Sequence, residues 1–309
     1  MSKEVLIITS YYPPETGAAA NRIYNLATGL SEEGFNVSVI TPAPNYPKGK
    51  IFSGYRDRFK YVTTENTIKV YRLWLYASNS KNIIKRLFAM LSYSISLLVF
   101  FLFNKIPNKV IVQSPPLIVA FTCMLFLRSR KRKLILNVSD LWPLAGLELG
   151  AFKKNLIYKI LQRIERFNYK KANVIMGQSE EILSHVKVIF PDKQLILYRN
   201  FPKEEELALS NSTQKEGKLR IVYAGLLGHA QGIYKLLQSL DLTNIEFHIY
   251  GAGAEQNSIE EFISNNNNTG VFYHGVVSRE LVLEEIQKHH LVIIPLLNRI
   301  YGSVPSKIF

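Results

Sequence analysis

Arg-Ile-Val-Tyr-Ala-Gly-Leu-Leu-Gly-His-Ala-Gln-Gly, residues 220–232, is the stretch that decides the fold. An apolar strand ends at Ala224 and breaks into a loop from Gly225 to Gly232, and a helix is predicted over 233–240. A strand that stops at a glycine turn and feeds a helix is typical of the phosphate-facing loop of an open parallel sheet. An acidic linker, 203–218, precedes it. We therefore predict two α/β domains, one over residues 1–200 and a second over residues 201–309.

Composition limits the class of protein. The 309 residues are 47% hydrophobic and 20% charged, which is enough to bury a core and excludes a disordered chain. The single cysteine, Cys123, cannot form an internal disulfide, and no Cys/His cluster has metal-ligand spacing, so we expect a reducing compartment and no metal. The chain starts directly on an apolar strand, so no secretory signal is expected.

Positive charge is concentrated in the first domain. Residues 1–198 contain 28 Lys and Arg against 12 Asp and Glu, whereas residues 199–309 contain 10 against 12. A field of this sign implies an anionic partner, which leaves nucleic acid, anionic lipid and phosphorylated sugar as classes.

The start of the first domain reads as a strand–loop–helix–strand unit. Its predicted elements are strands over 5–9, 37–41 and 68–73, a helix over 21–33 and an irregular stretch over 42–66. The loop that contains Gly17 follows the first strand and is expected at the carboxyl end of the sheet, where ligands bind. The alternative is that Pro13, Pro14 and Gly17 only shape a tight connection.

Residues 87–103 form an apolar segment without a charge. As a helix of about 26 Å it falls short of a hydrocarbon core of ~30 Å, so a crossover helix is favoured over a spanning one. A second apolar run, 117–127, leads into a cationic cluster made of Arg128, Arg130, Lys131, Arg132 and Lys133. Apolar helices beside cations are typical of a protein on an anionic membrane surface.

Two other interpretations of that cluster stay open. One is a buried crossover helix followed by a solvated charge run. The other is nucleic-acid binding, which is disfavoured because no helix-turn-helix, RNP or KH signature is present.

Asp140 is the candidate catalytic residue. The strand over 133–138 delivers it to the carboxyl edge, where a carboxylate could hydrogen-bond sugar hydroxyls or orient an acceptor; its alternative role is to cap the helix that follows. In the second domain, the strand over 246–250 breaks into Gly251-Ala-Gly253. This Gly-x-Gly is weak evidence for a nucleotide by itself, and it gains weight because it follows a strand and opens a helix.

Several motifs together carry a resemblance. They are Ile-Thr-Ser-Tyr-Tyr-Pro-Pro-Glu-Thr-Gly (8–17), Asp-Leu-Trp-Pro (140–143), Arg-Asn-Phe (199–201), Tyr-Ala-Gly (223–225) with Gln-Gly (231–232), Gly-x-Gly (251–253) and Val-Pro-Ser-Lys-Ile-Phe (304–309). In this order they resemble the retaining glycosyltransferases of family 4, which have the GT-B fold of two Rossmann-like domains. Within that family the chain is similar to the WbuB-like or fucosamine-transferase-like branch, and the resemblance covers the whole chain.

The resemblance implies transfer of a hexosyl-type sugar, with retention and without a cofactor, from a nucleotide-sugar such as a UDP-sugar to a lipid-linked glycan. It implies a role in capsule, O-antigen or exopolysaccharide synthesis, and a cytoplasmic protein at the inner face of the cell membrane. The donor would be held mainly by the second domain and the acceptor by the first. The implied donor and phosphate contacts are Gly17, Arg199, Asn200, Gly225, Gly228, Gln231, Gly232, Gly251, Gly253, Arg299, Ser306 and Lys307.

The sequence departs from the family pattern at three places. Ser139 stands where many members have histidine. Leu226 and Gln231 stand where many carry arginine and lysine, which leaves Lys307 and Arg299 as candidate phosphate cations. Of the family's two glutamates, which seven intervening residues separate, the first would fall at Gly302 and the second just after Phe309. We therefore expect an incomplete second domain, weak donor binding and little turnover. The alternative class is a non-catalytic protein that binds a membrane surface or a glycan.

Overall fold

The computed structural model describes residues 3–46, 48–56, 58–80, 82–150, 153–199, 217–229, 231–266, 270–295 and 301–302. The chain divides into two compact units, residues 1–200 with 300–306, and residues 201–299 with 307–309. Each unit contains its own largely parallel sheet, as the α/β prediction requires. Tyr301 and Gly302 belong to the first unit, whereas the sequence pattern placed them in the second domain.

The first unit is built on an eight-stranded sheet in the order β3-β4-β2-β1-β5-β6-β7-β8. Its strands are β1 (Glu4–Ile8), β2 (Asn36–Pro42), β3 (Lys60–Glu65), β4 (Ile68–Leu73), β5 (Lys109–Ser114), β6 (Lys133–Val138), β7 (Val174–Gly177) and β8 (Gln194–Leu197). All neighbours pair in parallel except β3, which is antiparallel to β4. Strand β3 corrects the expectation of an irregular stretch over 42–66. Its side chains alternate between exposed and half-buried at the sheet edge, so it lacks the apolar run of a central strand.

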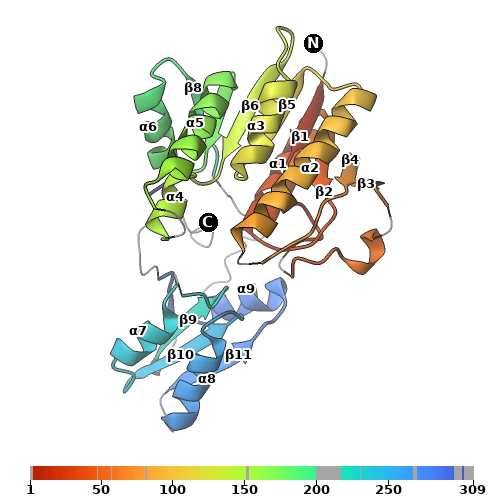
Figure 1. Ribbon diagram of the computed structural model, residues 1–309. Helices are drawn as coiled ribbons and strands as arrows, with labels where there is room; N and C mark the ends of the chain where they lie inside the picture. Colours follow the sequence, from red (N-terminus) through yellow and green to blue (C-terminus); the bar gives the residue numbers. More distant parts are fainter. Residues whose placement is uncertain are drawn as a thin grey trace. The chain divides into compact units, whose positions relative to one another are not determined.

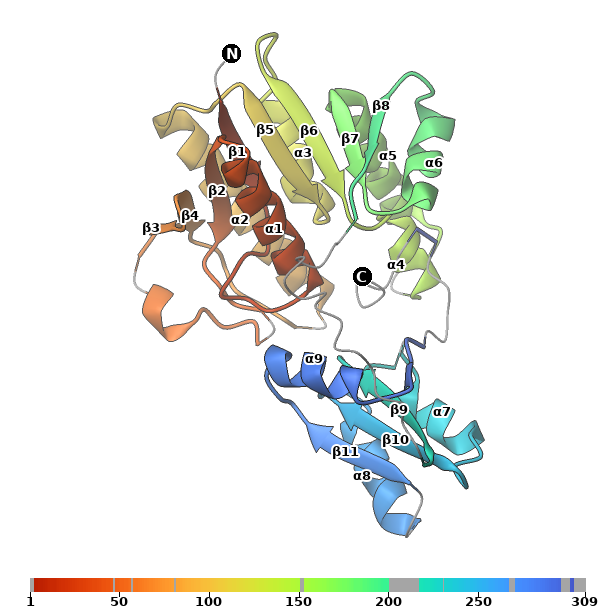
Figure 2. The ribbon, with the colours of Figure 1, turned by 180° about the vertical axis from the view of Figure 1, so that it is seen from behind.

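Helices cover both faces of this sheet (Figures 1 and 2). Helix α1 (Ala18–Glu32) packs on one face, where its Ile23 joins Val5 and Ile7 of β1 in the core. On the other face α2 (Ile83–Phe103), α3 (Leu117–Phe126) and α5 (Leu156–Lys171) lie side by side. Leu6 and Ile8 of β1 point to that second layer. The unit is completed by a 3-10 turn η1 (Ser53–Tyr55), α4 (Leu144–Glu148) and α6 (Glu180–Ile189).

Helix α2 is the crossover helix that the sequence predicts between β4 and β5. It begins at Ile83, four residues before the predicted segment, so the expectation that it is too short to span a hydrocarbon core was wrong. The side chain of Asn82 caps its first turn by accepting from the amide of Ile84 at 2.8 Å. On its inner side, the Tyr93 hydroxyl donates to the Thr9 carbonyl at 2.9 Å, and Leu97 is fully buried. Among the described helices, α2 alone is long and apolar enough to cross a membrane, and 28% of its apolar window is buried.

The second unit contains a four-stranded parallel sheet in the order β11-β10-β9-β12. Its strands are β9 (Leu219–Ala224), β10 (Ile245–Tyr250), β11 (Val271–Gly275) and β12 (Leu291–Val292), and its helices are α7 (Ile233–Ser239), α8 (Gln256–Asn265) and α9 (Arg279–Gln287). Tyr223, Phe247 and Ile249 form the centre of its core. Strand β12 is shorter than the stretch 291–295 expected from the sequence.

In both sheets the order in which successive strands are added reverses at the first strand of the unit. In the first unit β1 lies between β2 and β5, and in the second β9 lies between β10 and β12. In open α/β sheets, ligands bind beyond the carboxyl ends of the strands at such a reversal. The loops after β1 and β9 are therefore the positions in each unit where a ligand is expected.

The glycines of the second unit are needed for close packing of two loops. The amide of Gly225 donates to the Tyr250 carbonyl at 2.9 Å, and the amide of Leu227 to the Ala252 carbonyl at 3.0 Å. A Cβ at Gly251 would lie 1.9 Å from the Gly225 carbonyl oxygen, and a Cβ at Gly253 would lie 2.4 Å from the Leu227 carbonyl oxygen. Packing of backbone on backbone therefore accounts for the Gly-x-Gly motif without a ligand.

We expect Gly253→Ala to destabilise the second unit by roughly 1–3 kcal/mol, because its methyl group would meet the rigid backbone of Leu227. Gly228→Ala is the matched control, since its methyl group would meet only the flexible end of Gln231, at 2.7 Å. Hydrogen exchange of the β9 and β10 amides, read by mass spectrometry, measures the stability of this unit alone. Equal protection in the two variants would contradict the packing explanation.

Candidate functional site

The loop after β1 is held by polar contacts to neighbouring segments. The Thr9 hydroxyl bonds to the Tyr11 carbonyl at 2.9 Å and contacts Gln113 at the end of β5. The buried Glu15 carboxylate accepts from the amides of Asn45 at 2.7 Å and Tyr46 at 2.8 Å. Burial raises the pKa of Glu15, and these amide bonds oppose the shift. The conformation of the loop before α1 is therefore fixed by hydrogen bonds to other segments of the first unit.

Gly17 is the N-cap residue of α1. Its φ of 145° favours glycine, it is exposed, and nothing lies within 4 Å of the position that a Cβ would take. No side chain caps the helix. The first turn of α1 therefore presents backbone amides at the carboxyl edge of the sheet, and a helix N-terminus attracts anions.

Arg22, one turn into α1, is the polar centre of this edge. Its side chain is 2% exposed and donates to the Ser139 hydroxyl after β6 and to the Gln178 side-chain oxygen after β7. The hydroxyl of Tyr198, which follows β8, donates to the backbone carbonyl of Arg22 at 3.3 Å. One residue thus connects the segments that follow β1, β6, β7 and β8.

Charge couples Arg22 to Asp140. Burial lowers the pKa of the Arg22 guanidinium to about 10, and the negative charge of Asp140 opposes that shift. A buried cation is costly unless an anion compensates it, and the two hydrogen-bond acceptors of Arg22 are neutral. Asp140 is therefore placed beside a positive charge at the end of β6, where its partly buried side chain can meet a ligand.

Tyr301 and Gly302 dock onto the same edge of the first unit. The Tyr301 amide donates to the Glu148 carboxylate at 2.8 Å, and the Gly302 amide donates to the Glu181 carboxylate at 3.0 Å. The Ser179 hydroxyl donates to the Gly302 carbonyl at 2.8 Å. A Cβ at position 302 would lie 3.1 Å from the side chain of Leu141, the residue that follows Asp140 in the chain.

In the second unit, the loop after β9 leads into the start of α7. The carbonyl of Gly228 accepts from the amides of Gln231 at 3.0 Å and Gly232 at 3.3 Å. Gly232 is left-handed, with φ 61°, and is the N-cap of α7. The predicted residues Gly228, Gln231 and Gly232 are therefore joined in one turn at the carboxyl edge of the second sheet, and Gly225 begins the loop that leads to it.

Glu255 limits how an anion could use that turn. Its carboxylate is 8% exposed, accepts from the Tyr234 amide in the first turn of α7 at 3.2 Å, and lies 3.7 Å from the His229 ring. The Tyr234 amide is therefore already engaged by a carboxylate. A phosphate at this edge would have to bind the loop amides instead.

The remaining predicted residues are distributed as follows. Arg199 is partly buried directly after Tyr198. Arg128, Arg130, Lys131 and Lys133 are exposed at the opposite, amino edge of the first sheet. Arg132 is used within the fold, because it donates to the carbonyls of Ile106, Pro107 and Leu127 at 2.7–3.1 Å. Asn200, Arg299, Ser306 and Lys307 lie outside the described residues. In the part of the chain that the structure describes, no group of three potential metal ligands gathers.

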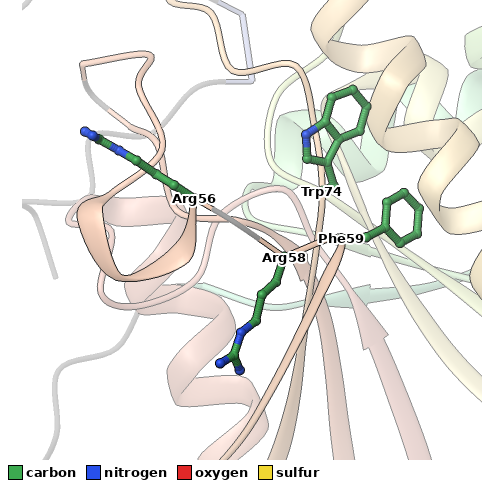
Figure 3. Close-up of a pocket in the computed structure, with 4 residues that line it drawn as sticks. All are labelled: Arg56, Arg58, Phe59 and Trp74. Carbon is green, nitrogen blue, oxygen red and sulfur yellow. The ribbon is translucent and has the colours of Figure 1, made fainter.

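A shallow pocket of about 390 Å³ lies near the edge strand β3 (Figure 3). It is lined by Arg56, Arg58, Phe59 and Trp74. The two guanidinium groups point away from one another, and the rings of Phe59 and Trp74 lie across the pocket from them. This pocket contains none of the residues that the sequence predicts for the site.

Sequence reasoning missed Arg22, Glu255 and the docking of Gly302. Arg22 could have been noticed as the one cation on the helical face that also carries Leu26, which is buried. Glu255 stands at a helix N-terminus, where an acid usually indicates only a cap. No local signal indicates that Gly302 binds the start of α6.

Comparison with known proteins reveals related sequences and folds. The family model described as "Glycosyl transferase 4-like domain" matches residues 17–198. A protein of Escherichia coli (strain K12) named as a colanic acid biosynthesis glycosyl transferase, WcaI, is 23% identical over 277 residues, 84% of this chain and 68% of that protein.

Many solved structures share the fold, and two of them are compared with the chain as examples. Sucrose-phosphate synthase from Thermosynechococcus elongatus matches with a TM-score of 0.67 and 12% identity, over 97% of this chain and 77% of its own. The catalytic domain of starch synthase IV from Arabidopsis thaliana, bound to ADP and acarbose, matches with a TM-score of 0.62 and 12% identity, over 100% of this chain and 80% of its own. The chain therefore has the α/β GT-B-like fold of glycosyltransferases, with one sheet in each unit.

The coupling of Arg22 to Asp140 can be measured by a double-mutant cycle. We expect Arg22→Gln and Asp140→Asn each to lower the free energy of unfolding, and the double variant to lose at least about 0.5 kcal/mol less than the sum, because each residue compensates the charge of the other. Urea unfolding followed by tryptophan fluorescence reports the first unit, since it contains both tryptophans, Trp74 and Trp142.

Arg132→Gln with Asp140→Asn is the control cycle, because Arg132 precedes β6 and Asp140 follows it. This pair should be additive. Additivity in the Arg22 cycle as well would show that Arg22 does not act on Asp140.

Proposed function

The chain belongs to the glycosyl transferase 4-like family, and on this premise we propose that it transfers a sugar from a nucleotide-sugar to a lipid-linked glycan in bacterial surface polysaccharide synthesis. The observation that carries the proposal is the family match over residues 17–198, which includes Gly17, Arg22 and Asp140. The similarity to WcaI, named for colanic acid biosynthesis, supports a polysaccharide product. Starch synthase IV, which holds ADP and acarbose, supports a nucleotide and a glycan as ligands of this fold.

The proposed reaction exchanges one bond at the anomeric carbon of the sugar. The bond from this carbon to the diphosphate oxygen breaks, the acceptor hydroxyl oxygen bonds to the same carbon, and the hydroxyl proton leaves with the diphosphate. Negative charge develops on the diphosphate as the bond breaks, and fixed amides and cations nearby lower that barrier. We infer retention of configuration from the family resemblance.

Residues of the first unit take the acceptor side of this proposal. Asp140 accepts a hydrogen bond from an acceptor hydroxyl, and Arg22 holds Asp140 and Ser139 in position. The uncapped amides after Gly17 are assigned to the donor phosphates, as the family resemblance implies. Arg22 also brings a buried cation to an edge where Ser139 replaces the histidine of many relatives.

Residues of the second unit take the donor side. The loop from Gly225 to Gly232 binds the diphosphate through those of its amides that the carbonyls of Tyr250, Ala252 and Gly228 do not already engage. Gly251 and Gly253 allow that loop to pack closely on the next one. Arg199 and, outside the described residues, Asn200, Arg299, Ser306 and Lys307 stay predictions as donor contacts.

The proposed location is the cytoplasmic side of the cell membrane, as a peripheral protein. A lipid-linked acceptor requires the protein to reach the bilayer, and the basic first unit is suited to an anionic surface. The alternative is a non-catalytic protein that binds a membrane surface or a glycan with the same fold. It differs from the enzyme in having no need for a nucleotide.

Nucleotide binding tests the proposal. UDP at one hundred times its Kd should stabilise the chain by about 2.7 kcal/mol, because only the folded state binds it, and a thermal-shift titration measures this. Asp140→Asn should leave the UDP shift unchanged and lower transfer by roughly 100-fold or more, since the residue serves the acceptor. Uridine, which lacks the diphosphate, is the ligand control. An unshifted melting temperature with UDP, ADP and GDP would favour the non-catalytic alternative.

A further inference from the structure

The outer side of α2 carries an apolar stripe from its first turn to its last, and its exposed cations, Lys85 and Arg86, lie in the first turn. The stripe recurs at helical spacing and consists of Ile84, Phe88, Leu91, Ile95 and Leu102, which are 59%, 61%, 41%, 60% and 78% exposed. The inner side, with Tyr93 and Leu97, is already in the core. A helix that covers a sheet in water normally turns charged residues outward. The stripe therefore exposes apolar surface that the first unit does not cover.

Helix α5 contributes cations to the same face. It is separated from α2 only by α3 (Figure 1). The exposed ionisable side chains of α5 are all basic, and they are Lys159, Arg163, Arg166 and Lys170. Its one acid, Glu165, is 4% exposed and accepts a hydrogen bond from Tyr169 at 3.0 Å. Helices α2 and α3 contain no acid. These three helices, all of whose residues are described, thus combine an apolar stripe with a cationic row.

We propose that the outer face of α2, α3 and α5 is the surface by which the protein lies on an anionic lipid bilayer. The apolar stripe enters the boundary between headgroups and acyl chains, and the cationic row of α5 contacts lipid phosphates. A stripe about 27 Å long, from Ile84 to Leu102, fits a helix that lies in the plane of the membrane.

A second copy of the chain is a poorer occupant of this face. Pairing the face with itself would bring two rows of lysine and arginine together, and like charges across an interface are costly. A membrane-spanning α2 also fits poorly, because the hydroxyl of Tyr93 would leave its partner, the buried carbonyl of Thr9.

This face begins at the edge of the sheet that carries Asp140. Helix α2 follows β4 and α5 follows β6, so both start at the carboxyl edge and run back along the sheet. Trp74 and Tyr76, 40% and 44% exposed, lie beside α2 there, and aromatic residues of this kind are enriched at membrane interfaces. A bilayer on this face would bring a lipid-linked acceptor to the Asp140 edge. That consequence rests on the proposed function, whereas the lipid contact itself does not.

On this face the contact with lipid phosphates is made by the cations of α5 and not by the cluster at residues 128–133. That cluster follows α3 at the amino edge, and one of its members, Arg132, is bound to backbone carbonyls. The row on α5 has the same charge, and only α3 separates its helix from the apolar stripe on α2, so it is the better partner for lipid phosphates.

Flotation of the whole chain with vesicles tests the apolar part. Wild-type protein should float with vesicles of phosphatidylcholine and phosphatidylglycerol at 7:3. Phe88→Gln with Ile95→Gln should reduce the bound fraction at least tenfold without changing the melting temperature, because both side chains are exposed. The matched control is Phe272→Gln with Val276→Gln, which removes a phenyl ring and an aliphatic side chain that are 44% and 74% exposed in the second unit. The control should float like wild type.

Two charge-neutralising triples test the electrostatic part. Lys159→Gln with Arg163→Gln and Arg166→Gln should weaken binding by roughly 100-fold, since each cation near an anionic surface contributes about 1 kcal/mol. Arg128→Gln with Arg130→Gln and Lys131→Gln should weaken it much less. Equal binding to pure phosphatidylcholine, or a larger loss from the second triple, would overturn the assignment to α5.

Two other outcomes would overturn the proposal as a whole. One is a stripe variant that floats as well as wild type. The other is that the wild-type chain does not bind vesicles but forms dimers, whereas the stripe variant is monomeric. The face would then join two copies of the chain. Failure of sugar transfer alone would contradict the proposed function and leave the lipid contact intact, since flotation requires no donor.

Discussion

The buried guanidinium of Arg22 is the interaction on which the candidate site of the first unit depends. It lies under the carboxyl edge of the sheet and bonds to side chains 117 and 156 residues further along the chain. Parallel strands bring the loops after β1, β6 and β7 to one edge, and Arg22 then fixes them relative to one another. The negative charge of Asp140 offsets part of the cost of burying this cation. The residue that holds the loops is thus also the one whose positive charge attracts the Asp140 carboxylate, at the edge where an acceptor would bind in the proposed function.

In the second unit, the loops at the carboxyl edge of the sheet are held together by backbone packing instead of by a buried charge. Gly251 and Gly253 let one loop pack directly on the turn after β9, and Glu255 caps the helix that this turn begins. The edge is therefore rigid and carries a carboxylate. In the proposed function a donor diphosphate would bind amides of the loop after β9, since positions 226 and 231 carry no cation. The first unit supplies positive charge and the second supplies a preformed turn.

Much of this arrangement could be predicted from sequence because central parallel strands are continuous apolar runs. The strands before Ser10, Ser139 and Gly225 were all identified by that signal, and with them the loops that follow. Strand β3 was missed because an edge strand alternates in polarity. The partners of Arg22 and Gly302 could not be predicted, since both contacts join residues more than 100 positions apart. Helix α2 was recognised as a crossover, but only packing shows which of its two apolar sides is covered.

The central claim is that the chain moves a sugar from a nucleotide to a lipid-linked glycan. The most direct measurement incubates the whole chain with bacterial membranes and isotope-labelled UDP-sugars, and follows the label in the lipid extract while NMR reads the anomeric configuration of the product. The account predicts labelled glycolipid with the configuration of the donor, in the small amount that weak donor binding allows, released UDP in equal amount, and loss of both with Asp140→Asn. UDP-sugars that stay intact in the presence of every acceptor fraction, or a product of inverted configuration, would contradict it.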